Sequence, residues 1–335
     1  DFSFIVHRFL RRFDPRLVVI VESDFWPNFL LATQNRKIPV AVLNGKMSNK
    51  SYRIHARTRL VPKLLRSLPV LAVQNEEYAS RLLKLGISPQ RVNVTGDMKY
   101  DLTDPAGRTE TSRDLRASLG FSLGDVVIIG GSLHDRENEV LIESYQRLIA
   151  KHANVSLIIV PRYPTDVSRI EEVLEERALN PVRKTQVDVA KKQPPGRKSV
   201  LLVDTMGELS ALYGVADIAF VGGSLCYRGS NKGGHNLIEP AVFGVPILFG
   251  PYNFSFRGTV QELLGADAGI QVSNAADLSA ALESLLGNEH ERLEMGRRAR
   301  EVVLQGQGVT DRNYELLAPL PVSYTHLTLP TNREV

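Results

Sequence analysis

The residues whose types and spacing best suit chemistry lie in the glycine-rich stretch GGSLCYRGSNKGGHNLIEP, residues 222–240. Asn236 stands where it would cap the amino end of a helix, and Glu239 follows three residues later, as the acid of a capping box does. A capped helix after a surface loop accounts for these two residues, but it leaves the Gly-Gly-His run at 233–235 unexplained. Glycines let backbone N–H groups approach a ligand, a helix amino terminus favours a phosphate, and a glutamate can bind a ribose diol. The pattern therefore predicts a nucleotide site, with the capped helix as the structural alternative.

A second candidate loop, VDTMGEL at 203–209, also lies between a predicted strand and a predicted helix. Asp204 and Thr205 can cap that helix, and Gly207 leaves its backbone N–H groups accessible. An ordinary helix cap explains this loop equally well when it is considered alone.

Two more loops follow predicted strands in the same half of the chain. VPRYP (160–164) places Arg162 where it can pair with a phosphate or a carboxylate, and GGSLHDRENE (130–139) contributes His134. A surface arginine and a structural histidine are the alternatives for these two residues. Because the carboxyl ends of parallel strands lie at one edge of a sheet, the convergence of four such loops supports a ligand site more strongly than any one loop does.

The first part of the chain has its own polar residues after predicted strands. VIVESDFWPN (19–28) ends a buried strand with Glu22, and TGDMKYD (95–101) places Lys99 after another strand. Glu22 either caps the following helix or points into a cleft, and Lys99 is either solvated or neutralises a phosphate. The basic run NGKMSNKSYRIHARTR (44–59) either lines an anionic acceptor site or forms a solvated helix face.

The elements that must position these loops are strands and helices in alternation. The segments EEYASRLLKLGI (77–88) and ENEVLIESYQRLIAKH (137–152) have helical periodicity. Runs that are nearly continuous in Val, Ile and Leu predict strands covered on both faces: RLVVIVES, PVAVLNG, PVLAVQN, RVNVTG, DVVIIGGS, VSLIIVP, SVLLVD, DIAFVGG and VPILFGP. This alternation predicts an α/β protein with doubly wound, parallel sheets.

The length of 335 residues indicates two domains, and the polar stretch near 101–124 is the best boundary between them. We expect a first domain at 1–101, a second at 102–319 and a cleft between the two. The start at Asp1, already in an amphipathic helical pattern, predicts that the first domain is entered partway through. The threonine-rich tail 320–335 has no helical period, and we expect it to be an appended, artefactual sequence.

Composition narrows the classes of function. The formal net charge of +4 is too small for this length to indicate a nucleic-acid partner, although it suits an anionic substrate or membrane surface. Cys226 is the only cysteine, which excludes an internal disulfide, and we find no apolar run long enough to span a bilayer and no signal peptide. A P-loop, a metalloprotease motif, a nucleophile elbow and clear metal spacing are missing from the sequence. The residues therefore favour metal-free group transfer from a nucleotide-activated donor.

Several motifs together resemble the 3-deoxy-D-manno-octulosonic acid (Kdo) transferase family of lipopolysaccharide biosynthesis. The similarity extends from about Phe4 to about Leu317, and the motifs occur in the order of that family: ESDFWPN, AVQNEEYASRLLKLG, VTGDMKYD, VPRYP, DTMGELSALYGVADIAFVGG and GGHNLIEPAVFGVPILFGP.

This resemblance implies a GT-B glycosyltransferase fold with two Rossmann-like, parallel-sheet domains, of which the second binds the donor. It implies that Kdo moves from CMP-Kdo to a lipid A precursor, lipid IVA, with release of CMP. The reaction would need neither a metal nor a cofactor. It would take place at the cytoplasmic face of the bacterial inner membrane, so the implied partners are CMP-Kdo, the lipid acceptor and the membrane surface, but no nucleic acid.

The resemblance also implies roles for individual residues. Glu22 and Lys99 match transition-state stabilisers, which act by preorganised charge. Arg162 and backbone N–H groups would hold the donor phosphate, and Glu239 would hold the ribose. The matching donor-binding positions are Pro161, Arg162, Met206, Gly207, Glu208, Gly234, His235, Asn236, Leu237, Ile238 and Glu239.

The sequence departs from the family in five features. Family members begin with a membrane-anchoring segment and an SVGE-like motif that supplies the general base, and no residue here matches either. The link CYRGSNK is longer than usual, Leu133 stands where the family has Thr, and the tail has no counterpart. We therefore expect a truncated transferase that binds CMP but catalyses poorly. The alternatives are a GT-B enzyme for a UDP- or GDP-sugar and a catalytically dead nucleotide-binding module.

Overall fold

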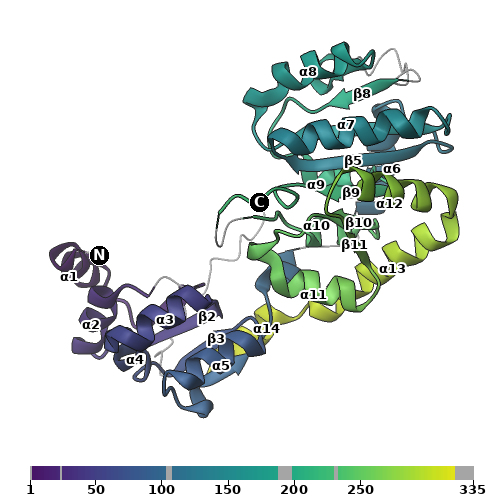
Figure 1. Ribbon diagram of the computed structural model, residues 1–335. Helices are drawn as coiled ribbons and strands as arrows, with labels where there is room; N and C mark the ends of the chain where they lie inside the picture. The colour runs from purple at the N-terminus through teal and green to yellow at the C-terminus, as the bar shows by residue number, and fades with distance from the viewer. Residues whose placement is uncertain (1, 23–24, 103–107, 188–197, 230–232, 321–335) are drawn as a thin grey trace, which may run out of the picture. The chain divides into compact units, whose positions relative to one another are not determined.

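The computed structural model describes residues 2–22, 25–102, 108–187, 198–229 and 233–320. The chain folds into two compact units (Figure 1). The first comprises Asp1–Asp101 and Gly306–Val335, and the second comprises Leu102–Gln305. Each unit contains a β-sheet in which all paired strands are parallel. The prediction of an α/β protein with two parallel-sheet domains is therefore confirmed.

The sheet of the first unit has the strand order β1-β2-β3-β4 in the described residues. Its strands are β1 (Val18–Val21), β2 (Val40–Gly45), β3 (Val70–Val73) and β4 (Val92–Val94). The helices around it are α1 (Ser3–Phe13), α2 (Pro27–Asn35), α3 (Asn49–Thr58), α4 (Leu60–Leu65), α5 (Glu76–Lys84), η1 (Pro89–Arg91) and η2 (Met98–Leu102).

Burial of the strands explains this first sheet. Every residue of β2 and β3 is buried, as expected for runs that are apolar on both faces, whereas the edge strand β1 alternates between half-buried and exposed residues. Side-chain caps fix where two of the helices begin. Ser48 accepts a hydrogen bond from the Ser51 N–H at the start of α3, and Asn75 accepts one from the Tyr78 N–H at the start of α5.

The helix α14 (Val309–Leu317) belongs to this first unit although it comes from the other end of the chain. The carboxylate of Asp101 accepts hydrogen bonds from the backbone N–H groups of Gly308, at 2.7 Å, and Thr310. The sequence-based boundary at 102–319 placed this helix in the second domain. The structure assigns it to the first because Leu316 and Leu317 of the helix, together with Leu320 just beyond it, pack on the sheet against Ala41, Leu43, Val70 and Ala72.

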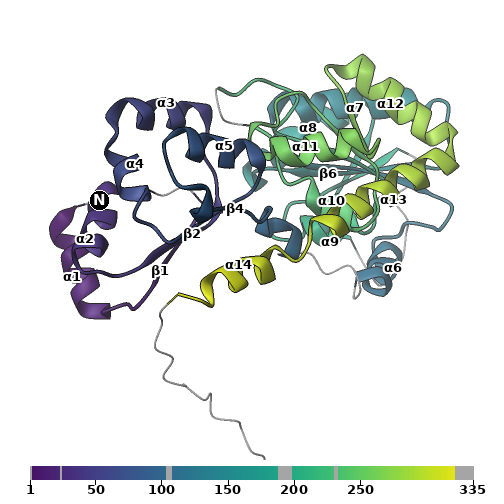
Figure 2. The same ribbon diagram turned by 90° about the horizontal axis from the view of Figure 1, so that it is seen from below.

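The sheet of the second unit has the strand order β11-β10-β9-β5-β6-β8-β7 in the described residues. Its strands are β5 (Val126–Leu133), β6 (Val155–Pro161), β7 (Asn180–Arg183), β8 (Ser199–Leu202), β9 (Ile218–Val221), β10 (Ile247–Phe249) and β11 (Gly269–Gln271). The helices are α6 (Arg108–Ser118), α7 (Asp135–Ile149), η3 (Pro164–Asp166), α8 (Val167–Glu176), η4 (Lys184–Gln186), α9 (Leu209–Tyr213), α10 (Ile238–Val242), η5 (Phe254–Phe256), α11 (Arg257–Gly265), α12 (Ala275–Gly287) and α13 (Glu289–Gly306). Figure 2 shows helices on both faces of this sheet, with α7 and α8 on one side and α9 and α10 on the other.

The connection order changes direction at the centre of this sheet. From β5 the chain passes to β6 and on to β7 and β8, and it then returns to place β9 on the other side of β5. In open α/β sheets a ligand binds beyond the carboxyl ends of the strands at such a switch point. The loops that follow β5 and β9 are therefore the expected position of a ligand-binding site.

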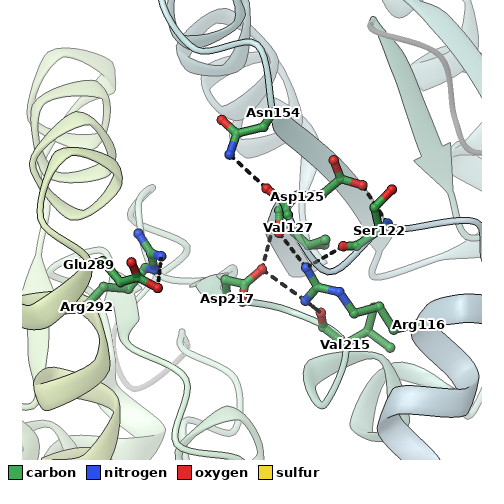
Figure 3. Close-up of polar contacts among 10 residues, drawn as sticks. Arg116, Ser122, Asp125, Val127, Asn154, Val215, Asp217, Glu289 and Arg292 are labelled. Atoms are coloured by element: carbon green, nitrogen blue, oxygen red, sulfur yellow. Dashed lines mark hydrogen bonds and ion pairs between the residues drawn. The ribbon is translucent and has the colours of Figure 1, made fainter.

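A polar network occupies the opposite, amino end of the same strands (Figure 3). The guanidinium of Arg116 on α6 donates hydrogen bonds to the Asp217 carboxylate at 3.1 Å and to the Val215 carbonyl oxygen at 2.9 Å. The same carboxylate accepts a hydrogen bond from the Val127 N–H at 2.7 Å. These contacts join α6 to the starts of β5 and β9, at the end of the strands opposite to the switch-point loops, so this network is structural.

Candidate functional site

A buried carboxylate joins the two loops at the switch point. Glu137, in the first turn of α7, is 1 % exposed. Its oxygens accept hydrogen bonds from the backbone N–H of His134 at 3.0 Å and from three successive N–H groups after β9: Gly223 at 2.6 Å, Ser224 at 2.9 Å and Leu225 at 2.8 Å. Three successive N–H groups form the kind of concavity that binds anions. Here the protein's own carboxylate fills it, so a ligand phosphate must find other donors.

The second glycine pair of the 222–240 loop, at 233–234, allows the loop to pack closely against neighbouring backbone. Gly233 and Gly234 have positive φ angles of 133° and 80°. A Cβ atom on Gly233 would lie 2.3 Å from the Tyr252 carbonyl oxygen, and one on Gly234 would lie 2.5 Å from Oδ1 of Asn253. Only glycine fits both the backbone conformation and the space. The close approach brings the loop back against Gly223, whose carbonyl oxygen accepts a hydrogen bond from the Gly234 N–H at 2.7 Å.

This return places His235 beside His134. The two Nε2 atoms lie 2.8 Å apart, and the imidazole rings stack at 13° with their centroids 5.1 Å apart. Tyr163, just after β6, packs its ring edge-on against His134, and the guanidinium of Arg162 lies 5.6 Å from the centre of the Tyr163 ring. The end of β6 is held there by a hydrogen bond from the Arg162 N–H to the Leu133 carbonyl oxygen at 2.8 Å.

The electrostatics of this cluster favour a negatively charged ligand. Burial and, to a smaller extent, charge interactions with His134, Arg162 and Arg228 together lower the pKa of His235 to about 4. The Glu137 carboxylate already accepts four backbone hydrogen bonds. The cluster therefore combines cationic side chains with an acid that is committed to the backbone.

The turn from Asn236 to Glu239 differs from the predicted capping box. The helix α10 begins at Ile238 with Leu237 as its N-cap, so the prediction of Asn236 as N-cap was wrong. Asn236 instead accepts a hydrogen bond from the Ile238 N–H at 3.1 Å, and its side-chain amide donates one to the Glu239 carboxylate at 3.1 Å. Leu237 and Ile238 are fully buried, because they anchor this turn in the core. Their backbone, rather than their side chains, remains for a ligand.

Glu239 also influences a buried neighbour. Burial raises the pKa of Tyr213, and the negative charge of Glu239 raises it further. Tyr213 in turn lies under Gly131, where a Cβ atom would approach its hydroxyl oxygen to 2.1 Å. The carboxylate of Glu239 thus stands at the edge of the core, beside the strand ends.

The loop at 203–209 lies at the same edge, beyond the end of β8. Glu208 forms an ion pair with Lys184 at 2.7 Å and accepts a hydrogen bond from Thr205. Both contacts lower the pKa of Glu208, and the contact with Lys184 has the larger effect. Asp204 does not cap α9 as expected, because its carboxylate accepts hydrogen bonds from Thr185 instead. Met206 is largely exposed, and Gly207, with φ of 86°, has open space around its Cα.

The candidate residues of the first unit follow the carboxyl ends of strands in its own sheet. Glu22 follows β1 in the left-handed region, with φ of 73°, and its carboxylate forms an ion pair with Lys46 at 2.9 Å. Asn44, at the end of β2, accepts hydrogen bonds from the Gln74 side chain at 3.0 Å and from the Met98 N–H at 3.1 Å. Asn44 thereby fixes the segment that carries Lys99.

Sequence reasoning missed Glu137, Tyr163, Asn44 and the partner of Glu22. The spacing of His134 and Glu137 in GGSLHDRENE was a capping-box signal that could have found the buried carboxylate. The pairing of Lys46 with Glu22 had no local signal, because the two residues follow different strands and are 24 positions apart.

Neither a metal site nor a membrane span is found in the described residues. No group of three or more His, Cys, Asp or Glu side chains in those ranges is placed to hold a metal ion. Within the same part of the chain, every helix is too short or too polar to cross a bilayer.

Comparison with protein families and curated sequences gives consistent results. Residues 1–102 match a family model described as 3-deoxy-D-manno-octulosonic-acid transferase (kdotransferase). The chain is 30% identical to the 3-deoxy-D-manno-octulosonic acid transferase of Haemophilus influenzae over 321 residues, which is 95% of this chain and 73% of that protein. It is also 30% identical to the corresponding transferase of Chlamydia trachomatis over 319 residues, covering 95% of this chain and 71% of the relative.

Solved structures resemble the fold. The C-terminal CMP-Kdo binding domain of WaaA from Acinetobacter baumannii superposes with a TM-score of 0.51 at 25% identity, covering 58% of this chain and 97% of that domain. A glycosyltransferase from Rickettsia africae superposes with a TM-score of 0.59 at 16% identity, covering 95% of this chain and 81% of the other. The second similarity concerns the fold alone, which is the GT-B fold of glycosyltransferases.

Proposed function

The chain belongs to the Kdo transferase family, and we propose that it transfers Kdo from CMP-Kdo to a lipid A precursor, lipid IVA, with release of CMP. The observation that carries this proposal is the cluster at the switch point of the second unit. There Arg162, His134 and His235 gather beside the turn that ends in Glu239. The resemblance of this unit to a CMP-Kdo binding domain supports a sugar nucleotide as the ligand.

The donor phosphate would lie against the guanidinium of Arg162, after Pro161 at the end of β6, and against the backbone at Gly234 and His235. Arginine is suited to this role because its planar guanidinium donates to two phosphate oxygens at once. The ribose would accept and donate hydrogen bonds at Glu239, whose carboxylate Asn236 orients at 3.1 Å. The exposed backbone of Met206 and Gly207, beside Glu208, would contact the rest of the nucleotide.

In the first unit, Glu22 and Lys99 would stabilise the transition state. Charge develops on the sugar and on the departing phosphate, so groups held in place before the reaction lower the barrier most. The ion pair with Lys46 and the hydrogen bond from Met98 to Asn44 provide such preorganisation.

We further propose that the reaction takes place at the cytoplasmic face of the inner membrane. The helix α1 supports a membrane surface as partner, because it exposes Phe4, Ile5 and Phe13 together with Arg11 and Arg12. Transfer to lipid IVA in vesicles of anionic phospholipid should then exceed transfer to the same acceptor in neutral vesicles. Equal rates in the two would argue against a membrane partner.

Calorimetric titration with CMP tests the donor site most directly. CMP should bind more tightly than UMP and GMP, and Glu239→Ala should weaken CMP binding by about 1–3 kcal/mol through loss of a charge-assisted contact. The matched control is Glu283→Ala. It removes an exposed glutamate of α12 that pairs with Lys151, and it should leave CMP affinity unchanged.

Other results of this titration would lead to other conclusions. Preference for UMP or GMP would indicate a GT-B enzyme with another donor. Tight CMP binding without Kdo transfer to lipid IVA would indicate a nucleotide-binding module. Unchanged affinity in Glu239→Ala would remove Glu239 from the site.

A further inference from the structure

The contact between His134 and His235 limits how many protons the two rings can hold. A hydrogen bond between two Nε2 atoms, here 2.8 Å apart, contains a single hydrogen. One ring must therefore present Nε2–H and the other a lone pair, so the two rings together carry at most one positive charge in this arrangement. The pair is therefore either neutral or, with one extra proton, carries a single positive charge.

The groups around the pair oppose that extra proton. Arg162 and Tyr163 face it from the end of β6, Arg228 acts on it from the 222–240 loop, and Glu137 lies below it on α7. The two arginines are positive, and the one carboxylate is hydrogen-bonded to four backbone N–H groups. Burial, followed by charge interactions with His134, Arg162 and Arg228, lowers the pKa of His235 to about 4, so the His235 ring itself is neutral at neutral pH.

A bound anion would reverse this balance. Its negative charge would offset the arginines and attract a proton to the pair. We propose that His134 is a further donor-site residue, and that the His134–His235 pair takes up one proton when the phosphate of the donor binds beside Arg162. This inference rests on the proposed function, because CMP supplies the phosphate.

The coupling has a measurable consequence. Binding of phosphate and binding of the proton favour one another equally, as linkage requires. Between the pKa of the pair in the empty site and its higher pKa in the complex, CMP affinity should fall by up to about tenfold for each unit of rising pH. Outside that window the affinity should not depend on the pair.

Calorimetry in buffers with different ionisation enthalpies counts the protons taken up. The chain is titrated with CMP at about pH 7, where histidine titration is most readily shifted. We expect an uptake in the parent protein that exceeds the uptake in His134→Asn and His235→Asn by up to one proton. The phosphate of CMP also titrates in this range, but its contribution is common to the parent and the variants. His290→Asn, at an exposed position on α13, is the matched control and should behave as the parent does. Cytidine, which lacks the phosphate, should bind without proton uptake.

Three results would overturn the inference. CMP binding with the same proton uptake in parent and variants would overturn it alone, and would leave the proposed function standing. Failure of CMP to bind at all would overturn both. If a variant does not fold, nuclear magnetic resonance titration of the parent replaces it: histidine pKa values that do not rise with saturating CMP would exclude the coupling.

Discussion

Glu137 shows how one side chain can determine the shape of a binding loop. It is buried, and its two oxygens hold the starts of two loops together through four backbone N–H groups. A buried charge of this kind is tolerated because all its hydrogen bonds are made. The side chain therefore positions both histidines without contacting a ligand itself.

Glu137→Gln should lower the free energy of unfolding of the second unit by about 2–4 kcal/mol, because a donating amide replaces an accepting oxygen among N–H groups that are left unsatisfied. Denaturant unfolding measures this change. Glu139→Gln is the matched control on the same helix. Its side chain is half exposed and lies 3.9 Å from Arg169, so the control should change stability by less than about 0.5 kcal/mol. Equal effects of the two substitutions would show that Glu137 does not hold the loops.

Glu22 illustrates a strained residue at a candidate site. Its φ of 73° is unfavourable for a residue with a Cβ atom, by roughly 1–2 kcal/mol. Such conformations persist where the surrounding structure imposes them, which here includes the hydrogen bond from the Glu22 N–H to the Leu43 carbonyl oxygen at 2.9 Å.

Glu22→Gly should therefore be more stable than Glu22→Ala by about 1 kcal/mol. Both substitutions remove the ion pair with Lys46, so that contact cancels from their difference. What remains is the relief of left-handed strain by glycine, reduced by the greater conformational entropy of glycine in the unfolded chain. Thermal and denaturant unfolding of the two variants provide the measurement. If Glu22→Ala proved as stable as Glu22→Gly, the backbone at this position would not be left-handed.

At the scale of elements, two ion pairs near the second sheet look alike but should differ in effect. Arg116 and Asp217 join α6 to the starts of β5 and β9, and their side chains are 15% and 31% exposed. Arg292 and Glu289 lie 3.9 Å apart on α13, and the Glu289 side chain is 77% exposed. Figure 3 shows both pairs. Only the first satisfies backbone groups of a strand.

Asp217→Ala should cost about 1–3 kcal/mol of unfolding free energy, because it leaves the Val127 N–H and the Arg116 guanidinium without their acceptor. Glu289→Ala should cost less than about 0.5 kcal/mol, because the Glu289 side chain is 77% exposed and its 3.9 Å contact with Arg292 is weakened by solvent. Added salt should not change which of the two substitutions costs more unfolding free energy. A cost for Glu289→Ala that matched the cost for Asp217→Ala would contradict the structural role of the Arg116 network.

At the scale of the whole molecule, the two units are not continuous segments of sequence. The chain leaves the first unit after Asp101 and returns to it at Gly306, so α14 completes the first hydrophobic core. Asp101 fastens the returning segment. Burial acts to raise its pKa, but the hydrogen bonds from Thr310 and Gly308 outweigh burial and hold the pKa below its usual value.

Removal of residues 306–335 should therefore destabilise the first unit and spare the second. In scanning calorimetry we expect the transition of the first unit to shift to lower temperature or disappear. The transition of the second unit should still respond to CMP, with about 2.7 kcal/mol of added stability at a ligand concentration of 100 times the dissociation constant. If the transition temperature of the second unit also fell in the truncated protein, the assignment of α14 to the first unit would be wrong.

The sequence by itself determined the central strands of both sheets and the loops that follow them. Long runs of Val, Ile and Leu need burial on both faces, and that need is local and therefore visible in the sequence. The strands that went unpredicted are β7 and β11, which lie at the two edges of the second sheet. Edge strands are short and half exposed, and β7 even contains Pro181, so they lack the apolar run that signals a buried strand.

Only the tertiary structure decided which polar residues meet. Four features join residues that are distant in sequence: the pairing of Lys46 with Glu22, the contact between His134 and His235, the three hydrogen bonds from residues 223–225 to Glu137, and the return of α14 to the first sheet. His134 with Glu137 and Asn236 with Glu239 did have a local signal, because the residues of a capping box are three positions apart. For the others, the side-chain types fix what each residue can donate or accept, and the parallel sheet fixes which strand ends become neighbours.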